Sequence, residues 1–160
     1  MSEIRIRPAR RGDTADLVRL GNELARFLNA PQVYSVEIFE RYGFGPDPHF
    51  EVLVAELAGE IAGYALFEAA FNTDLCEPGM WLHDIIVAEA MRRRGIGERL
   101  MAAVARLTLD RGCTSLWWGV LSSNTGALRF YTHLGARDED ARIQELDSAA
   151  LRALADHAES

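Results

Sequence analysis

The segment of residues 81–100 constrains the fold of this chain more than any other. It reads W-L-H-D-I-I-V-A-E-A-M-R-R-R-G-I-G-E-R-L. An apolar run ends near Val87, a short basic turn follows, and residues 95–111 have the period of an amphipathic helix. The apolar stripe of that helix is Leu100, Val104 and Leu107. A strand joined directly to a helix in this way predicts an α/β arrangement.

The rest of the chain supplies further strands and helices of ordinary length. Consecutive strands followed by strand–helix–strand units predict a mixed sheet with helices on both faces. We expect a tight hairpin at Ala-Gly-Glu and a loop over residues 72–79, which include Pro and Gly. The predicted strands are residues 4–7, 51–57, 61–71, 80–87, 114–121 and 142–146. The predicted helices are a helix N-capped by Asp13, then residues 35–42, 95–111, 124–133 and 148–157.

Composition excludes several classes of protein. With 160 residues, 49% hydrophobic and 26% charged, we expect one soluble domain over residues 1–160. No apolar run is long enough to cross a membrane, and no signal peptide is predicted at the N-terminus. Two widely separated cysteines predict a reduced, cytoplasmic protein, and no His or Cys spacing predicts a metal site.

Charge narrows the possible partners. The net charge of −7 argues against binding to nucleic acid, which needs a basic surface. All 17 basic residues are arginine. The chain therefore has no lysine for a Schiff base or for a Walker A loop.

The turn before the helix of residues 95–111 has the features of an anion site. Gly95 and Gly97 let the backbone approach a ligand closely, and the unpaired amides of a first helical turn attract a pyrophosphate. Leu100 stands where a dinucleotide fingerprint needs glycine. A surface arginine run with turn glycines is the alternative interpretation. The predicted contacts are Arg92, Arg93, Arg94, Gly95, Ile96, Gly97 and Glu98.

In this context, Arg92-x-x-Gly95-x-Gly97 resembles the pyrophosphate loop of the GNAT acetyltransferases. The resemblance extends over nearly the whole chain and is nearest to the diamine and spermidine/spermine acetyltransferase branch. The segments that carry it are I-R-P-A, E-L-A-R, G-F-G-P-D-P-H-F, L-V-A-E, D-I-I-V and R-F-Y-T-H-L-G-A. It implies a GNAT fold with a mixed sheet of six to seven strands, acetyl-CoA as co-substrate, a small amine as acceptor, no metal and a homodimer.

The resemblance also implies roles for particular residues. The backbone of Ile85, Ile86 and Val87 would pair with the pantetheine amides of the cofactor. Asn124 would hydrogen-bond the pantetheine arm, and Tyr131 would protonate the departing thiolate. From the residues alone, the favoured interpretation of Tyr131 is a core aromatic residue beside Phe130.

At His83-Asp84 the chain departs from the polyamine branch, which has Glu-Asp there and uses the Glu as a base through water. Adjacent residues of a regular strand face opposite sides, so we expect these two to be separated. An imidazole, with a reference pKa of about 6.5, is a better-matched base at neutral pH than a carboxylate. We therefore predict that His83 is catalytic or contacts the substrate. The alternative is a half-buried, hydrogen-bonded histidine, with Asp84 or water as the proton acceptor.

The sequence does not assign roles to the other carboxylates, and it does not decide among related activities. Four carboxylates could line a cationic acceptor site, although each alone is better explained as surface charge: Glu23, Glu68, Asp74 and Glu77. The alternatives to a small-amine acetyltransferase are an enzyme for protein N-termini, lysines or aminoglycosides, and a non-catalytic acyl-CoA-binding module.

Overall fold

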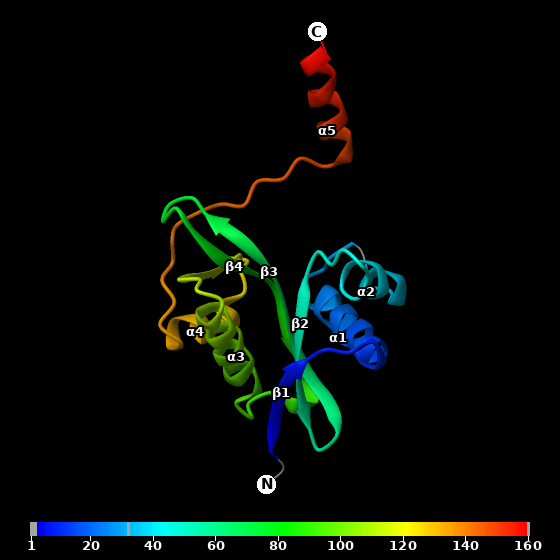
Figure 1. Ribbon diagram of the computed structural model, residues 1–160, viewed down its shortest axis with the longest axis vertical. Coiled ribbons are helices and arrows are strands. Elements are labelled where there is room, and N and C mark those ends of the chain that lie inside the picture. The colour runs from blue at the N-terminus through cyan, green and yellow to red at the C-terminus, as the bar shows by residue number, and fades with distance from the viewer. Residues whose placement is uncertain (1–2, 32, 160) are drawn as a thin grey trace. The chain divides into compact units, whose positions relative to one another are not determined.

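Five strands form the sheet at the centre of the first part of the chain. The structure is a computed structural model that describes residues 3–31 and 33–159. It divides into two compact units, residues 1–118 and 119–160, each of which is described by itself. The strands of the first unit are β1 (Ile4–Pro8), β2 (Glu51–Leu57), β3 (Glu60–Asn72), β4 (Glu77–Val87) and β5 (Ser115–Trp118) (Figure 1).

The strands lie in chain order across the sheet. All neighbours are antiparallel except β4 and β5, which are parallel. Ala58 and Gly59 alone connect β2 to β3, as the predicted hairpin requires. The mixed sheet predicted from the order of elements is confirmed.

Helices cover both faces of this sheet (Figure 1). On one face, α1 (Thr14–Phe27) and α2 (Val36–Tyr42) pack on a core to which the strands contribute alternate residues. On the other face lies α3 (Ile96–Asp110), with Leu100 and Val104 fully buried. The core beneath α1 and α2 is made by Leu17, Leu20, Phe39, Val52, Val54, Ile61, Tyr64, Leu66 and Ile86.

The hairpin between β3 and β4 is longer than the sequence predicted. Residues 72–79 are not a loop throughout, because β4 begins at Glu77 and Gly79 pairs with Ala70 of β3. A Cβ at Gly79 would collide with the side chains of Ser115 and Trp117. Gly79 is therefore needed for the close approach of β5, and not for a turn.

The second unit contains two helices, α4 (Thr125–His133) and α5 (Ser148–Ala155). Residues 142–146 form no strand, and Ile143 and Leu146 are exposed. The prediction of six to seven strands is therefore wrong, because a segment forms a strand only where another strand pairs with it. Among the described residues, no helix combines the length and apolar character needed to span a membrane.

Candidate active site

The strand β4 carries a β-bulge at His83. Asp84 pairs with Leu66 of β3, but the next pair along the ladder joins Leu82 to Phe67, so His83 is an extra residue on its strand. A bulge shifts the alternation of side chains by one residue. His83 and Asp84 therefore face the same side of the sheet. The expectation that they face opposite sides is wrong, because it assumed a regular strand.

Contacts across the two strands identify the shared face. Leu66, the partner of Asp84, belongs to the core beneath α1 and α2, and Glu68 lies two residues further along the same face. His83 Nε2 lies 3.1 Å from Glu68 Oε1. The His83 ring also meets the ring of Trp81 at 75°, with 6.4 Å between centroids. The imidazole thus stands on the α1–α2 side of the sheet.

Two phenols surround Asp84 on that face. The Tyr34 hydroxyl donates a hydrogen bond to Asp84 Oδ2. The buried Tyr64 hydroxyl has no hydrogen-bond partner among the described residues, although the Asp84 charge is close enough to act on it. Burial, followed by the Asp84 charge, raises the pKa of both Tyr34 and Tyr64. Both phenols therefore remain protonated around a carboxylate.

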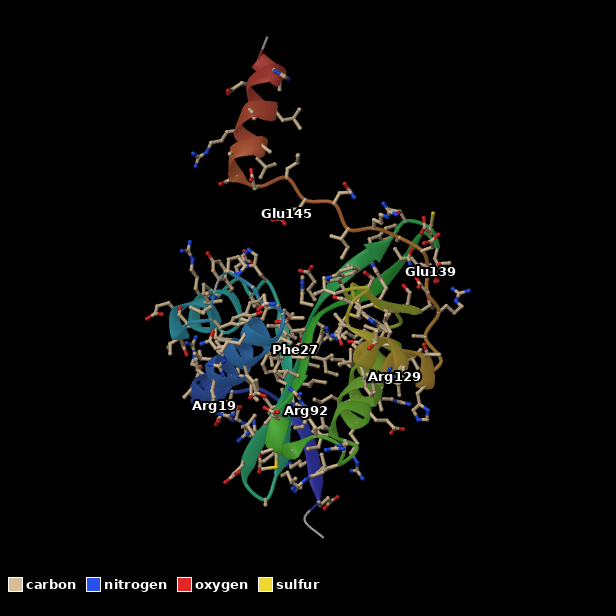
Figure 2. The ribbon with its side chains drawn as sticks, turned by 180° about the vertical axis from the view of Figure 1, so that it is seen from behind. Arg19, Phe27, Arg92, Arg129, Glu139 and Glu145 are labelled. Atoms are coloured by element: carbon tan, nitrogen blue, oxygen red, sulfur yellow. The ribbon has the colours of Figure 1, made fainter. Side chains whose placement is uncertain are left out.

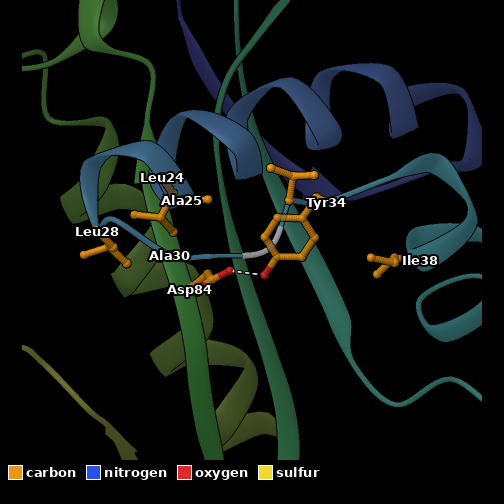
Figure 3. Close-up of a pocket in the computed structure, with 8 residues that line it drawn as sticks. Leu24, Ala25, Leu28, Ala30, Tyr34, Ile38 and Asp84 are labelled. Atoms are coloured by element: carbon orange, nitrogen blue, oxygen red, sulfur yellow. Dashed lines mark hydrogen bonds between the residues drawn. The ribbon is translucent and has the colours of Figure 1, made fainter.

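A pocket of about 300 Å³ opens beside this carboxylate (Figure 3). Apart from Asp84 and Tyr34, its lining is aliphatic. Such a surface suits a small ligand that presents one cationic group and an apolar body. The lining residues are Leu24, Ala25, Leu28, Ala30, Val33, Tyr34, Ile38 and Asp84.

Beyond the bulge, β4 continues past the end of its ladder with β5. That ladder ends where Leu82 pairs with Trp118, whereas β4 stays paired with β3 as far as Val87. The backbone of Ile85, Ile86 and Val87 thus has an edge beyond the β5 ladder. Such an edge can pair with the amides of an extended ligand.

The turn into α3 presents backbone amides, as the sequence predicted. Gly95 is the N-cap in the left-handed region, with φ of 77°. The first helical hydrogen bond runs from Arg99 N to Gly95 O over 3.1 Å. The amides of Ile96, Gly97 and Glu98 therefore precede the hydrogen-bonded ladder of the helix, where they favour an anion.

All three arginines of the run are exposed, and Arg92 also contacts neighbouring elements. Arg92 Nε donates to Val87 O over 3.1 Å, and Arg92 Nη2 lies 3.6 Å from Glu23 Oε1. The Arg92 guanidinium also stacks on Phe27, 6.0 Å from the ring centroid (Figure 2). Arg92 therefore ties the turn to β4 and α1. The other two members of the run are Arg93 and Arg94.

The four weaker carboxylates have separate surroundings. Glu68 pairs with His83, whereas Glu23 accepts from Glu89 N over 3.0 Å and Glu77 accepts from the Thr114 hydroxyl. The fourth, Asp74, lies in the β3–β4 turn, where its backbone N–H donates to Asn72. Within residues 3–31 and 33–159, no group of His, Cys, Asp and Glu side chains is arranged to hold a metal ion.

The second unit holds the other two predicted site residues. Asn124 is the N-cap of α4, and its Oδ1 accepts from Ala127 N over 3.1 Å. The cap engages the side-chain oxygen and not the amide nitrogen. Tyr131 lies in the same helix, half-buried, with its ring 5.4 Å from that of Phe130. Their contacts with cofactor stay predictions.

The aromatic and aliphatic parts of the site carry no recognisable sequence signal. Tyr34 and Tyr64 carry no motif, and only the fold brings them to Asp84. Leu24 and Leu28 are spaced four residues apart, as on one face of a helix, and such spacing alone does not distinguish a core face from the wall of a pocket. Glu68 was considered only as a possible cation ligand.

Comparisons with known proteins point to one family. Residues 19–136 match the model of the acetyltransferase (GNAT) family. Thialysine N-epsilon-acetyltransferase of Mus musculus is 36% identical over 148 residues, which cover 86% of each chain. L-ornithine N5-acetyltransferase of Arabidopsis thaliana is 32% identical over 120 residues, covering 74% of this chain and 50% of the relative.

A solved structure, an aminoglycoside N-acetyltransferase in complex with CoA, has the same fold. Its TM-score is 0.76 at 21% identity, and the alignment covers 92% of this chain and 97% of the other. The fold therefore agrees with the two sequence comparisons. The chain belongs to the GNAT acetyltransferase family.

Proposed function

We propose that the protein transfers the acetyl group of acetyl-CoA directly to the primary amine of a small molecule: a polyamine, a diamine or an amino-acid-like amine. The observation that carries this proposal is the β4 bulge. It brings His83 and Asp84 onto one face, beside a pocket that fits a small amine. The relatives named for thialysine and L-ornithine acetylation support an acceptor of this class.

Two backbone surfaces fit the cofactor. The amides of residues 96–98 suit a pyrophosphate, and the exposed Arg93 and Arg94 add positive charge beside them. The β4 edge from Ile85 to Val87 suits the amides of pantetheine. In this proposal Arg92 acts mainly by holding the turn in place. Asn124 contributes the side chain that contacts the pantetheine arm.

His83 and Tyr131 handle the protons of the reaction. His83 takes a proton from the bound ammonium, so that the neutral nitrogen can attack the thioester carbon. As the carbon–sulfur bond breaks, Tyr131 donates a proton to the departing thiolate. The second proton lost from the nitrogen goes to solvent, from which Tyr131 is reprotonated. Asp84 attracts the cationic amine to the mouth of the pocket.

The organisation of the whole protein forms part of the same proposal. The family match runs across both units, which supports one acetyltransferase domain over residues 1–160. The exposed Leu151 and Leu154 of α5 are residues that a homodimer joined through its C-terminal half would bury. Two free cysteines, Cys76 and Cys113, support a reducing, cytoplasmic location.

A panel of primary amines tests the reaction itself. Putrescine, spermidine, ornithine, lysine and thialysine are incubated with acetyl-CoA, and released thiol is measured against a reaction without amine. We expect saturable turnover with at least one of them. Absence of turnover on every amine would overturn the small-amine proposal.

Substitutions at position 83 test the base. His83→Ala should lower kcat/KM for the best amine by about 100-fold, the usual contribution of a general base. His83→Glu should keep activity but move the acid limb of the pH–rate profile to lower pH, because a carboxylate stays ionised further into acid. Ionisation of the amine affects all three proteins equally. Superimposable profiles with equal rates would show that His83 is structural.

A further inference from the structure

Glu68 of β3 is the side chain best placed to control the imidazole of His83. Its Oε1 lies 3.1 Å from His83 Nε2, and both side chains are 40% exposed. The contact is diagonal, since the direct partner of Glu68 across the ladder is Trp81. His83 lies two residues beyond Trp81, so regular alternation places it on the same side of the sheet as Glu68, and the bulge adds Asp84 to that side.

The chemistry of the two groups fixes the direction of the hydrogen bond. An ionised carboxylate only accepts, so the nitrogen that faces it must carry the proton. With the proton on Nε2, the lone pair of the neutral ring lies on Nδ1. We propose that Glu68 is a positioning residue that holds His83 in this tautomer, with Nδ1 as the atom that accepts the proton of the amine. The proposal rests on the function of His83 as the base.

The neighbours of His83 leave this role to Glu68. Asp84, the adjacent carboxylate, already accepts from Tyr34, and Trp81 meets the imidazole only through its ring. When Nδ1 takes a proton from the ammonium, the ring becomes an imidazolium that still donates from Nε2 to the ionised Glu68. The Nδ1 proton then passes to water, which restores the starting state.

A double-mutant cycle with the full-length protein tests the proposal. Glu68→Gln should lower kcat about tenfold or more, while KM for the amine stays within about threefold, because only orientation of the base is lost. In a His83→Ala background the same change should have no further effect. Glu68→Asp keeps the charge on a shorter stem and should recover part of the rate. Glu60→Gln, at the exposed start of β3, is the matched control and should leave both backgrounds unchanged.

The outcomes distinguish a failure of the proposed base, His83, from a failure of the proposed role of Glu68. If His83→Ala leaves the rate unchanged, the proposed base is wrong. If His83→Ala lowers the rate but Glu68→Gln has no effect, or the same effect in both backgrounds, the role of Glu68 is overturned. Melting curves and acetyl-CoA titrations verify that every variant is folded. Should Glu68→Gln unfold, Glu68→Asp is carried through the same cycle with the same criteria.

Discussion

The turn into α3 and the bulge of β4 belong to one continuous segment, yet they are built in different ways. The turn presents backbone amides, and Gly95, with its positive φ, sets their direction. The bulge presents side chains, and its partners Glu68 and Tyr34 come from distant parts of the chain. The difference shows that the region proposed for the cofactor is encoded locally, while the region proposed for the amine depends on the whole sheet.

The largest expected effect is at the turn. Gly97→Asp would place a charge against the pyrophosphate. Unit charges about 5 Å apart repel by about 3 kcal/mol at an effective dielectric constant of about 20. Pyrophosphate carries more than one such charge, so we expect acetyl-CoA affinity to fall by at least about a thousandfold in isothermal titration.

The control for that change is Gly12→Asp, which adds the same charge where a Cβ meets no atom within 4 Å. It should bind acetyl-CoA normally. Equal affinity in the two variants would contradict the assignment of the turn to the cofactor, and with it the contrast between the two regions.

Tyr131→Phe examines a group that belongs to neither region. If Tyr131 is the acid, turnover should drop by about 100-fold or more while acetyl-CoA affinity is kept. Steady-state kinetics and titration measure the two quantities. Tyr42→Phe, which removes a phenol from α2, is the control and should be silent. A loss below about threefold would return Tyr131 to a packing role beside Phe130.

Two substitutions of tyrosine by phenylalanine test which phenol stabilises Asp84 beside the bulge. Tyr34→Phe removes the donor to Asp84 and should lower the free energy of unfolding by about 2 kcal/mol, as expected for a hydrogen bond to a charged group. Tyr64→Phe removes a buried hydroxyl that has no partner among the described residues, so it should be neutral or stabilising by up to about 1 kcal/mol. Urea denaturation measures both, and equal losses would mean that both phenols hold Asp84.

A smaller loss of stability than that at Tyr34 is expected at Asp13, which is remote from both regions. The Arg7 guanidinium donates to it over 2.7 and 2.9 Å and lowers the pKa of Asp13. The stabilisation is therefore complete above about pH 4, the ordinary carboxyl value, and is lost as pH falls through the lower folded value. Asp13→Asn should lower the free energy of unfolding by about 1.5 kcal/mol at pH 7. The difference in stability between this variant and the wild type should disappear toward pH 2.

A surface pair provides the comparison for Asp13. Asp16 pairs with Arg19 with both side chains about half exposed, so Asp16→Asn should change the free energy of unfolding by less than about 0.5 kcal/mol. Urea titrations from pH 2 to pH 7 measure both variants. If the stability difference between Asp13→Asn and the wild type does not vary with pH, the ion pair with Arg7 is not its cause.

Much of the fold was predictable because its signals are local. The bounds of β2 matched the apolar pattern, and Gly95 marked the start of α3. The bulge could not be predicted in the same way, because it exists only in the register between β3 and β4. Two other differences from the sequence prediction have the same cause. Residues Pro78 and Gly79 pair inside β4, and residues 142–146 form no strand. In both cases strand formation depends on a partner strand that the segment itself does not reveal.

The bulge also bears on how enzymes of this kind change substrates over evolutionary time. An extra residue in a strand has no backbone pairing partner of its own, and the side chain of His83 is 40% exposed. Position 83 can therefore exchange one chemical group for another with little cost to folding. A library restricted to positions 83 and 68 would vary the chemistry of the reaction and leave the scaffold intact.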